Sequence, residues 1–280
     1  MNATSTAPAK PFDGKDILFG IAACICVVVA HAIAYLTHEY AHSFTAWALG
    51  WMANPLAIDY GPPTLYNIIF LGGVSDNVNY APILAGGHGL AVVAIALAGM
   101  LIGNAALYYM LFLAARTRLV MTRPALLAGI FTLALMCAGN VWGYVPIRGF
   151  TTHADIAIAA SGLHLQTWVM GLCLLPLSLH IVWHCLFRFL PQCLDSAAAK
   201  SDVRLVLIIT LTGYWLFVFY GGEGTSGDYG LVSQLLSITS KYFLFPLSVA
   251  ALVTRHHSAR SMNRWLNSQS KADLTATSNR

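Results

Sequence analysis

The sequence predicts an all-α, polytopic integral membrane protein with about six transmembrane helices. Of its 280 residues, 58% are hydrophobic and 9% are charged, and the mean hydropathy is +0.67. This composition is too apolar for a soluble globular domain. A hydrocarbon core of about 30 Å requires about 20 apolar residues per helix. Runs of this length lie at 17–48, 84–115, 125–145, 165–190, 203–221 and 232–254.

Basic residues divide the chain into three regions and orient it. We predict a polar N-terminal arm (1–16), a transmembrane domain that contains the functional site (17–254) and a basic tail (255–280). Thirteen of the 15 lysines and arginines fall in the arm, in the turn at 116–124, in the segment at 188–204 or in the tail. With six spans, these regions share one side of the membrane, which the positive-inside rule makes cytoplasmic. Both termini are therefore predicted to be cytoplasmic, and the net charge of +4 implies no nucleic-acid partner.

A pattern typical of zinc-binding helices interrupts the first apolar run. The stretch HEYAH places His38 and His42 four residues apart, with Glu39 beside the first histidine. On a helix both imidazoles lie on one face and can bind one zinc ion, while the glutamate can deprotonate a zinc-bound water. Because the chain has two glutamates and ten histidines, a shuffled sequence contains this motif roughly once in 400 cases. The alternative is a structural helix whose buried histidines bond to neighbouring groups.

A HExxH motif in an apolar, polytopic chain resembles the site-2 protease family of intramembrane zinc metalloproteases. The resemblance rests on His38, Glu39 and His42 and covers residues 17–170. It implies a zinc cofactor, a transmembrane protein as substrate and a third metal ligand from an aspartate on a later span. That aspartate usually stands in an N-P-D-G or L-D-G signature, which this chain replaces with HADI.

Topology favours Asp155 as the third ligand. It follows a turn that contains proline and glycine, and it enters the membrane from the same predicted face as His38. His153, in the same loop, is the alternative ligand. An acidic residue at a helix N-terminus is also favoured by the helix dipole without any metal. Other downstream aspartates are Asp59, Asp76 and Asp228 in predicted outer loops, and Asp195 and Asp202 on the predicted cytoplasmic side.

These parts predict a hydrolytic mechanism. Zinc held by His38, His42 and Asp155 keeps a fourth position for water, and Glu39 serves as the general base. We predict that the amide of Asn140 stabilises the oxyanion, although an asparagine in a span is equally typical of helix packing. The loop at 49–83 is rich in Gly, Pro and Asn, and its residues 72–80 are predicted to gate the site or to present an edge to an unwound substrate strand.

The family resemblance and the loop charges predict different sides of the membrane for the opening of the site. The resemblance implies a site near the cytoplasmic face, whereas the loop charges place His38 towards the opposite face. Inversion of the whole chain, a re-entrant segment such as YNIIFLGGVS, or a site that works from the outer side would each reconcile them. We follow the loop charges.

Two other classes of function are compatible with the sequence. His31 and the pair His180 and His184 resemble the histidine boxes of membrane di-iron hydroxylases and desaturases, although their usual HxxHH boxes are missing from the predicted spans. The chain could also be a non-catalytic metal-binding membrane subunit, or a protease that works with an accessory membrane subunit in the lipid bilayer. Lys241, an isolated cation in the last span, is predicted to reach the outer interface or to pair with Glu223 or Asp228.

Overall fold

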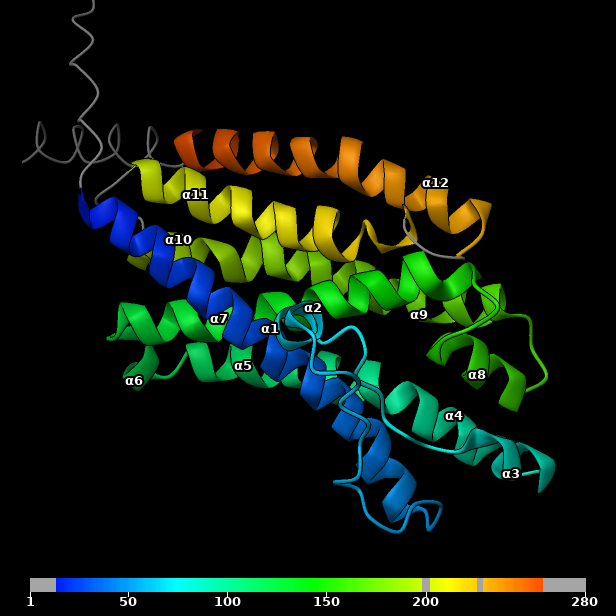
Figure 1. Cartoon of the computed structure of the whole chain (residues 1–280). Helices are drawn as coiled ribbons and strands as arrows, with labels where there is room; N and C mark the ends of the chain where they lie inside the picture. The colour runs from blue at the N-terminus through cyan, green and yellow to red at the C-terminus, as the bar shows by residue number, and fades with distance from the viewer. Residues whose placement is uncertain (1–13, 198–201, 226–228, 259–280) are drawn as a thin grey trace, which may run out of the picture.

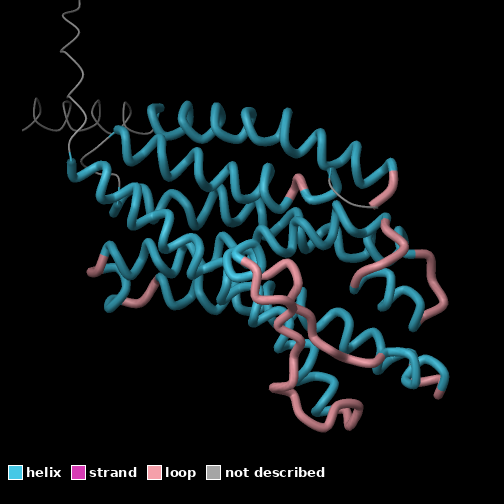
Figure 2. The backbone as a smooth tube through the Cα atoms, viewed as in Figure 1, coloured by secondary structure: helices cyan, strands magenta, loops and turns pink. Residues whose placement is uncertain are grey.

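The computed structural model describes residues 14–197, 202–225 and 229–258, and its regular elements are helices (Figures 1 and 2). Extended pairing within these ranges is limited to one isolated antiparallel bridge between Asp59 and Ser75. Most of the predicted arm, the tail beyond residue 258 and Asp228 lie outside the described residues.

Six helices in the described ranges are long and apolar enough to cross a membrane, which confirms the predicted fold class. They are Asp16–Ala48, Gly89–Ala115, Pro124–Phe150, Thr167–Asp195, Asp202–Tyr220 and Leu231–Ser258. Their segments are α1 (Gly14–Ala48); α4 (Gly89–Ala98), η1 (Gly99–Ala106) and α5 (Leu107–Ala115); α7 (Pro124–Trp142), η2 (Gly143–Ile147) and η3 (Arg148–Phe150); α9 (Thr167–His184), η4 (Cys185–Phe189) and α10 (Leu190–Ala197); α11 (Asp202–Gly213) and η5 (Tyr214–Tyr220); and α12 (Leu231–Thr239) and η7 (Ser240–Leu244).

Shorter helices join the spans. They are α2 (Leu65–Phe70) and α3 (Tyr80–Ala85) between the first two spans, α6 (Arg118–Met121) after the second, α8 (Asp155–Gly162) after the third and η6 (Glu223–Thr225) after the fifth.

Four span boundaries differ from the predicted ones by four residues or more. The fourth and sixth spans end at Asp195 and Ser258 rather than at 190 and 254, and the other two boundaries differ for local reasons. The second span begins at Gly89 rather than at 84, because the chain turns at Gly87, whose φ of +77° suits glycine. The third continues past 145 to Phe150. Pro146 lies in the π-helical segment η2, whose wider turns accommodate a residue that lacks a backbone N–H.

The basic segments gather at one end of the bundle. Figure 1 shows the start of α1, the start of α11, the end of the sixth span and the short helix α6 at this end, with α3 and α8 at the other. Arg118 in α6 and Arg204 in α11 belong to the first end. This arrangement agrees with the charge segregation in the sequence, and the assignment of that end to the cytoplasm remains a prediction.

The loop between α1 and α4 is a fixed structure along α1. Buried Asn67 organises it, because its Nδ2 donates to the carbonyls of Tyr60 and Pro62 and its Oδ1 accepts from the N–H of Gly73. Ser43 of α1 then donates from Oγ to the carbonyl of Asp76 at 3.0 Å. The loop therefore packs against the part of α1 that carries HExxH.

The first two spans approach closely at glycines. A Cβ added to Gly103 in η1 would lie 2.6 Å from the carbonyl oxygen of Thr37 and 2.8 Å from Cα of His38. Small residues let helix backbones approach in this way, and van der Waals packing is a main source of helix association inside a membrane. The contact sets the position of η1 beside the HExxH motif.

We expect Gly103→Ala to destabilise the protein by about 1–3 kcal/mol, because the added methyl group pushes η1 away from α1. Thermal unfolding in detergent measures this change. Gly129→Ala in α7 is the matched control, since nothing lies within 4 Å of its added Cβ, and we expect it to be neutral or stabilising by up to about 1 kcal/mol. Equal stability of the two variants would contradict the close-contact interpretation.

Candidate metal centre

Two histidines and one aspartate converge between α1 and α8. His38 and His42 lie one turn apart on α1 and are 2% and 1% exposed. Nε2 of His38 lies 3.1 Å from Oδ2 of Asp155, and Nε2 of His42 lies 3.3 Å from the same oxygen. One ligand atom from each residue fits within 4.8 Å of the others, so the group could hold a metal ion.

The backbone before Asp155 adopts an unusual conformation. Ala154 has a φ of +73°, a region that residues other than glycine rarely occupy. Such conformations cost about 1–3 kcal/mol and persist where the surrounding structure enforces them. Here the strained residue immediately precedes the first residue of α8, which is Asp155 itself.

Asp155 is held in its charged form. Its burial alone would raise its pKa, but the adjacent His42 and His38 lower the pKa by more, so that it lies well below the usual range. A carboxylate that stays ionised at neutral pH is a suitable metal ligand.

The hydrogen bonding of His42 leaves a lone pair facing Asp155. Nδ1 of His42 lies 2.7 Å from the carbonyl oxygen of Ile95 in α4. A carbonyl only accepts, so Nδ1 carries the proton and Nε2 of a neutral imidazole has none. An imidazole nitrogen and a carboxylate oxygen 3.3 Å apart then need a positive species between them, either a proton or a metal ion.

His38 is oriented by Asn104 of η1. The side-chain nitrogen of Asn104 lies 2.9 Å from Nδ1 of His38. In this arrangement Nδ1 accepts, and the ring proton on Nε2 is donated to Asp155. Binding a metal through Nε2 moves the proton to Nδ1, and Asn104 then has to present its oxygen by rotating its amide.

The space in front of the two imidazoles is kept open by a glycine. A Cβ added to Gly99 would overlap Nε2 of both His38 and His42. This cradle, the two nitrogen donors and the charged carboxylate together fit a metal ion with nitrogen and oxygen ligands.

Glu39 is 6% exposed and lies among charged groups. The charges that act on it belong to His42, Asp155, Asp76 and Arg148. The residue between the two histidines is thus directed into the protein, near the third member of the group, rather than towards lipid.

The structure distinguishes between the two predicted third ligands. Asp155 supplies the shared oxygen. The ring of His153 instead lies beside Tyr229, with 5.2 Å between ring centroids. Asn140, predicted to stabilise an oxyanion, is buried and donates to Oδ1 of Asn104 at 3.5 Å. Its predicted catalytic role is not tested by this contact.

The other histidines of the spans lie away from this group. His31 bonds to the hydroxyl of Tyr220 and to the carbonyl of Phe70. His184 bonds to the hydroxyl of Tyr108, and His180 is exposed beside Tyr109. Within the described residues, the His38, His42 and Asp155 group contains none of the further histidines, His31, His180 and His184, that the di-iron interpretation adds to His38 and His42.

Sequence reasoning missed the residues that surround the ligands. Tyr144 packs on His38 with 4.4 Å between ring centroids, and Asn104 and Gly99 come from η1. The spacing of Gly99 and Gly103 is a small-xxx-small pattern in an apolar span, which predicts close helix approach. That pattern was the available signal for η1 beside α1.

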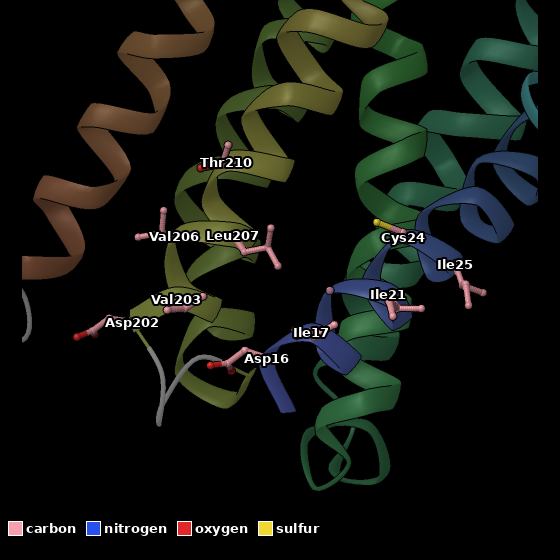
Figure 3. Close-up of a pocket in the computed structure, with 11 residues that line it drawn as sticks. Asp16, Ile17, Ile21, Cys24, Ile25, Asp202, Val203, Val206, Leu207 and Thr210 are labelled. Carbon is pink, nitrogen blue, oxygen red and sulfur yellow. The ribbon is translucent and has the colours of Figure 1, made fainter. Parts of the chain in front are cut away.

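Of two cavities, one adjoins the His38, His42 and Asp155 group and the other lies far from it. A polar cavity of about 560 Å³ is lined by Asn140, Tyr144 and Arg148 and thus adjoins the His38 side of the group. A larger apolar one, about 990 Å³, lies between the first turns of α1 and α11, where Ile17, Ile21 and Val206 line it (Figure 3). The second hollow lies at the far end of α1 and offers little polar chemistry.

Comparisons of the chain with family models, curated proteins and solved structures find no match.

We expect purified wild-type protein to bind about one metal ion per chain. His42→Ala and Asp155→Ala each remove one ligand atom, so both variants should lose the metal. His180→Ala is the matched control, because this histidine is exposed and lies elsewhere, and it should retain the metal. Mass spectrometry of the metal content measures all four proteins, and metal retained in the first two variants would contradict the assignment.

We expect Gly99→Ala to abolish metal binding although every ligand is unchanged, because its methyl group occupies the space in front of both Nε2 atoms. Chelator competition measures the affinity. Gly129→Ala again serves as the control and should bind metal like the wild type. An unchanged affinity in Gly99→Ala would show that the metal, if any, is bound elsewhere.

Proposed function

We propose that the chain is an intramembrane zinc metalloprotease that cleaves a membrane-embedded peptide bond of a transmembrane protein. The observation that carries this proposal is that Asp155, at the start of α8, meets His38 and His42 of α1, with one possible ligand atom of each residue within 4.8 Å of the others. The same helix α1 places Glu39 beside His38. The HExxH spacing and a carboxylate as the third ligand match the donor set of zinc peptidases, in which three protein ligands leave one position open.

The depth of the site supports an intramembrane substrate. His38 lies ten residues before the end of α1, and Gly99 lies ten residues after the start of the second span. At 1.5 Å per residue both are about 15 Å from the ends of these helices. A peptide bond at that depth belongs to a segment inserted in the bilayer.

Zinc, when bound, lowers the pKa of a coordinated water towards about 7 and polarises the scissile carbonyl. Glu39 would accept the proton of the attacking water on its carboxylate and return it to the leaving amine. Asp155 and His42 hold their donor atoms in place, the latter through its bond to the carbonyl of Ile95. The amide of Asn140 donates a hydrogen bond to the developing oxyanion.

The loop along α1 is suited to present a substrate strand. Asp59 and Ser75 already exchange both of their backbone hydrogen bonds, at 3.0 and 2.9 Å. Residues 72–80, which include Ser75, lie next to α1 through the contact between Ser43 and Asp76. Pairing with an edge strand would hold the substrate extended, which exposes its peptide bond to the water and to Glu39.

We expect Glu39→Gln to retain the metal and to lower the rate of cleavage by about 100-fold or more, because the amide cannot accept a proton. The assay uses single-span peptides reconstituted with the protein in lipid vesicles, and mass spectrometry identifies the products. Zinc rather than iron in the metal analysis is expected from the same preparation. Metal-loaded wild type that cleaves no peptide would instead indicate a non-catalytic metal-binding subunit.

A further inference from the structure

The polar cavity shares a wall with the metal group. Tyr144 and Asn140 line it, and Tyr144 also packs on His38. The guanidinium carbon of Arg148 and the ring of His38 each lie 4.4 Å from the centre of the Tyr144 ring. The cavity therefore begins no more than about twice that distance from the ligands, which is two or three residues of an extended peptide.

Positive charge exceeds negative charge among the residues that line this cavity. Arg148 is neutralised by Glu223, since its Nη2 and Nε lie 2.8 and 3.1 Å from Oε2 of that residue. Within the described residues Lys241 forms no salt bridge, and its Nζ donates to the hydroxyl of Thr225 at 3.4 Å. Of the pairings expected for Lys241, Glu223 is thus engaged by Arg148, and Asp228 lies outside the described residues. The described lining residues carry one positive charge in excess.

The structure makes room for Lys241 at the cavity. It lies in η7, within the sixth span, and a Cβ added to Gly222 would lie 2.8 Å from its Cδ. Gly222 therefore accommodates the aliphatic stem of the lysine. A cation inside a span is costly without a counter-charge. Tyr66, Tyr214 and Tyr229 also line the cavity, and a tyrosine hydroxyl can donate a hydrogen bond.

We propose that this cavity is a substrate subsite that selects an acidic side chain, aspartate or glutamate, a few residues from the scissile bond, with Lys241 as its counter-charge. The proposal rests on the proposed function. The shared wall with the metal group favours a substrate over a lipid headgroup, because a headgroup needs no connection to the ligands. Lys241 is thereby a specificity-determining residue rather than a member of the hydrolytic machinery.

Binding without cleavage tests the subsite. Zinc-loaded Glu39→Gln protein in nanodiscs of phosphatidylcholine is titrated with fluorescent single-span peptides that carry one glutamate at successive positions, and with matched glutamine peptides. At one register we expect the glutamate peptide to bind about tenfold more tightly, as one hydrogen bond between charged groups implies. Lys241→Met, added to this protein, should remove the preference, and Lys241→Arg should retain it.

Arg116→Gln is the matched control, because it removes one cation that lies over Phe112 at the opposite end of the second span. It should leave the preference unchanged. Thermal unfolding and zinc content show whether Lys241→Met folds. If it does not, the comparison of glutamate and glutamine peptides on protein that retains Lys241 still tests the acidic preference.

Three outcomes overturn the proposal. Equal binding of the two peptides, with wild-type protein that still cleaves, removes the acidic preference and leaves the protease function standing. A preference that disappears in phosphatidylglycerol nanodiscs, together with binding of that lipid through Lys241, assigns the cavity to a headgroup. Zinc-loaded wild type that binds the peptides without cleaving any of them defeats the proposed function and, with it, a substrate subsite.

Discussion

The contact between Asp155 and the two histidines is the constraint on which the rest of the site depends. It joins His38 to a residue 117 positions later in the chain, so the first residue of α8 must reach α1 before the group exists. Ionisable groups inside an apolar bundle lose hydration. These side chains regain favourable interactions from one another and from neighbours on other spans, such as the carbonyl of Ile95 and the amide of Asn104. The glycines of η1 belong to the same constraint, because any side chain at Gly99 would occupy the space between the imidazoles.

Features that follow from local pattern were predictable from the sequence. The six spans come from runs of apolar residues, and the pairing of His38 with His42 follows from helical periodicity. Asp155 required one further step, the argument that it enters from the same end as His38. In all three cases the information is carried by spacing along the chain, which elementary helix geometry converts into position.

The remainder of the site depends on packing between distant segments. Asn104 and Asn140 are both asparagines in apolar runs, and nothing in their local sequence shows which of them contacts a histidine. The packing of Tyr144 on His38 likewise joins two distant spans. The position of Asp155 rather than His153 beside the histidines depends on how the turn at Ala154 directs the chain. For His180 and His184, local spacing was misleading. They have the spacing of a histidine box, and yet they lie apart from the His38, His42 and Asp155 group.

The hydrogen bond from His42 to the carbonyl of Ile95 links the geometry of the metal group to the relative position of the first two spans. The acceptor is a backbone atom, so no change of side chain at position 95 removes it, whereas sliding of α4 along α1 does. The metal affinity of this group would therefore change when the register between the two spans changes. A substrate or subunit that shifts one helix against the other would change the hold on the metal without touching a ligand.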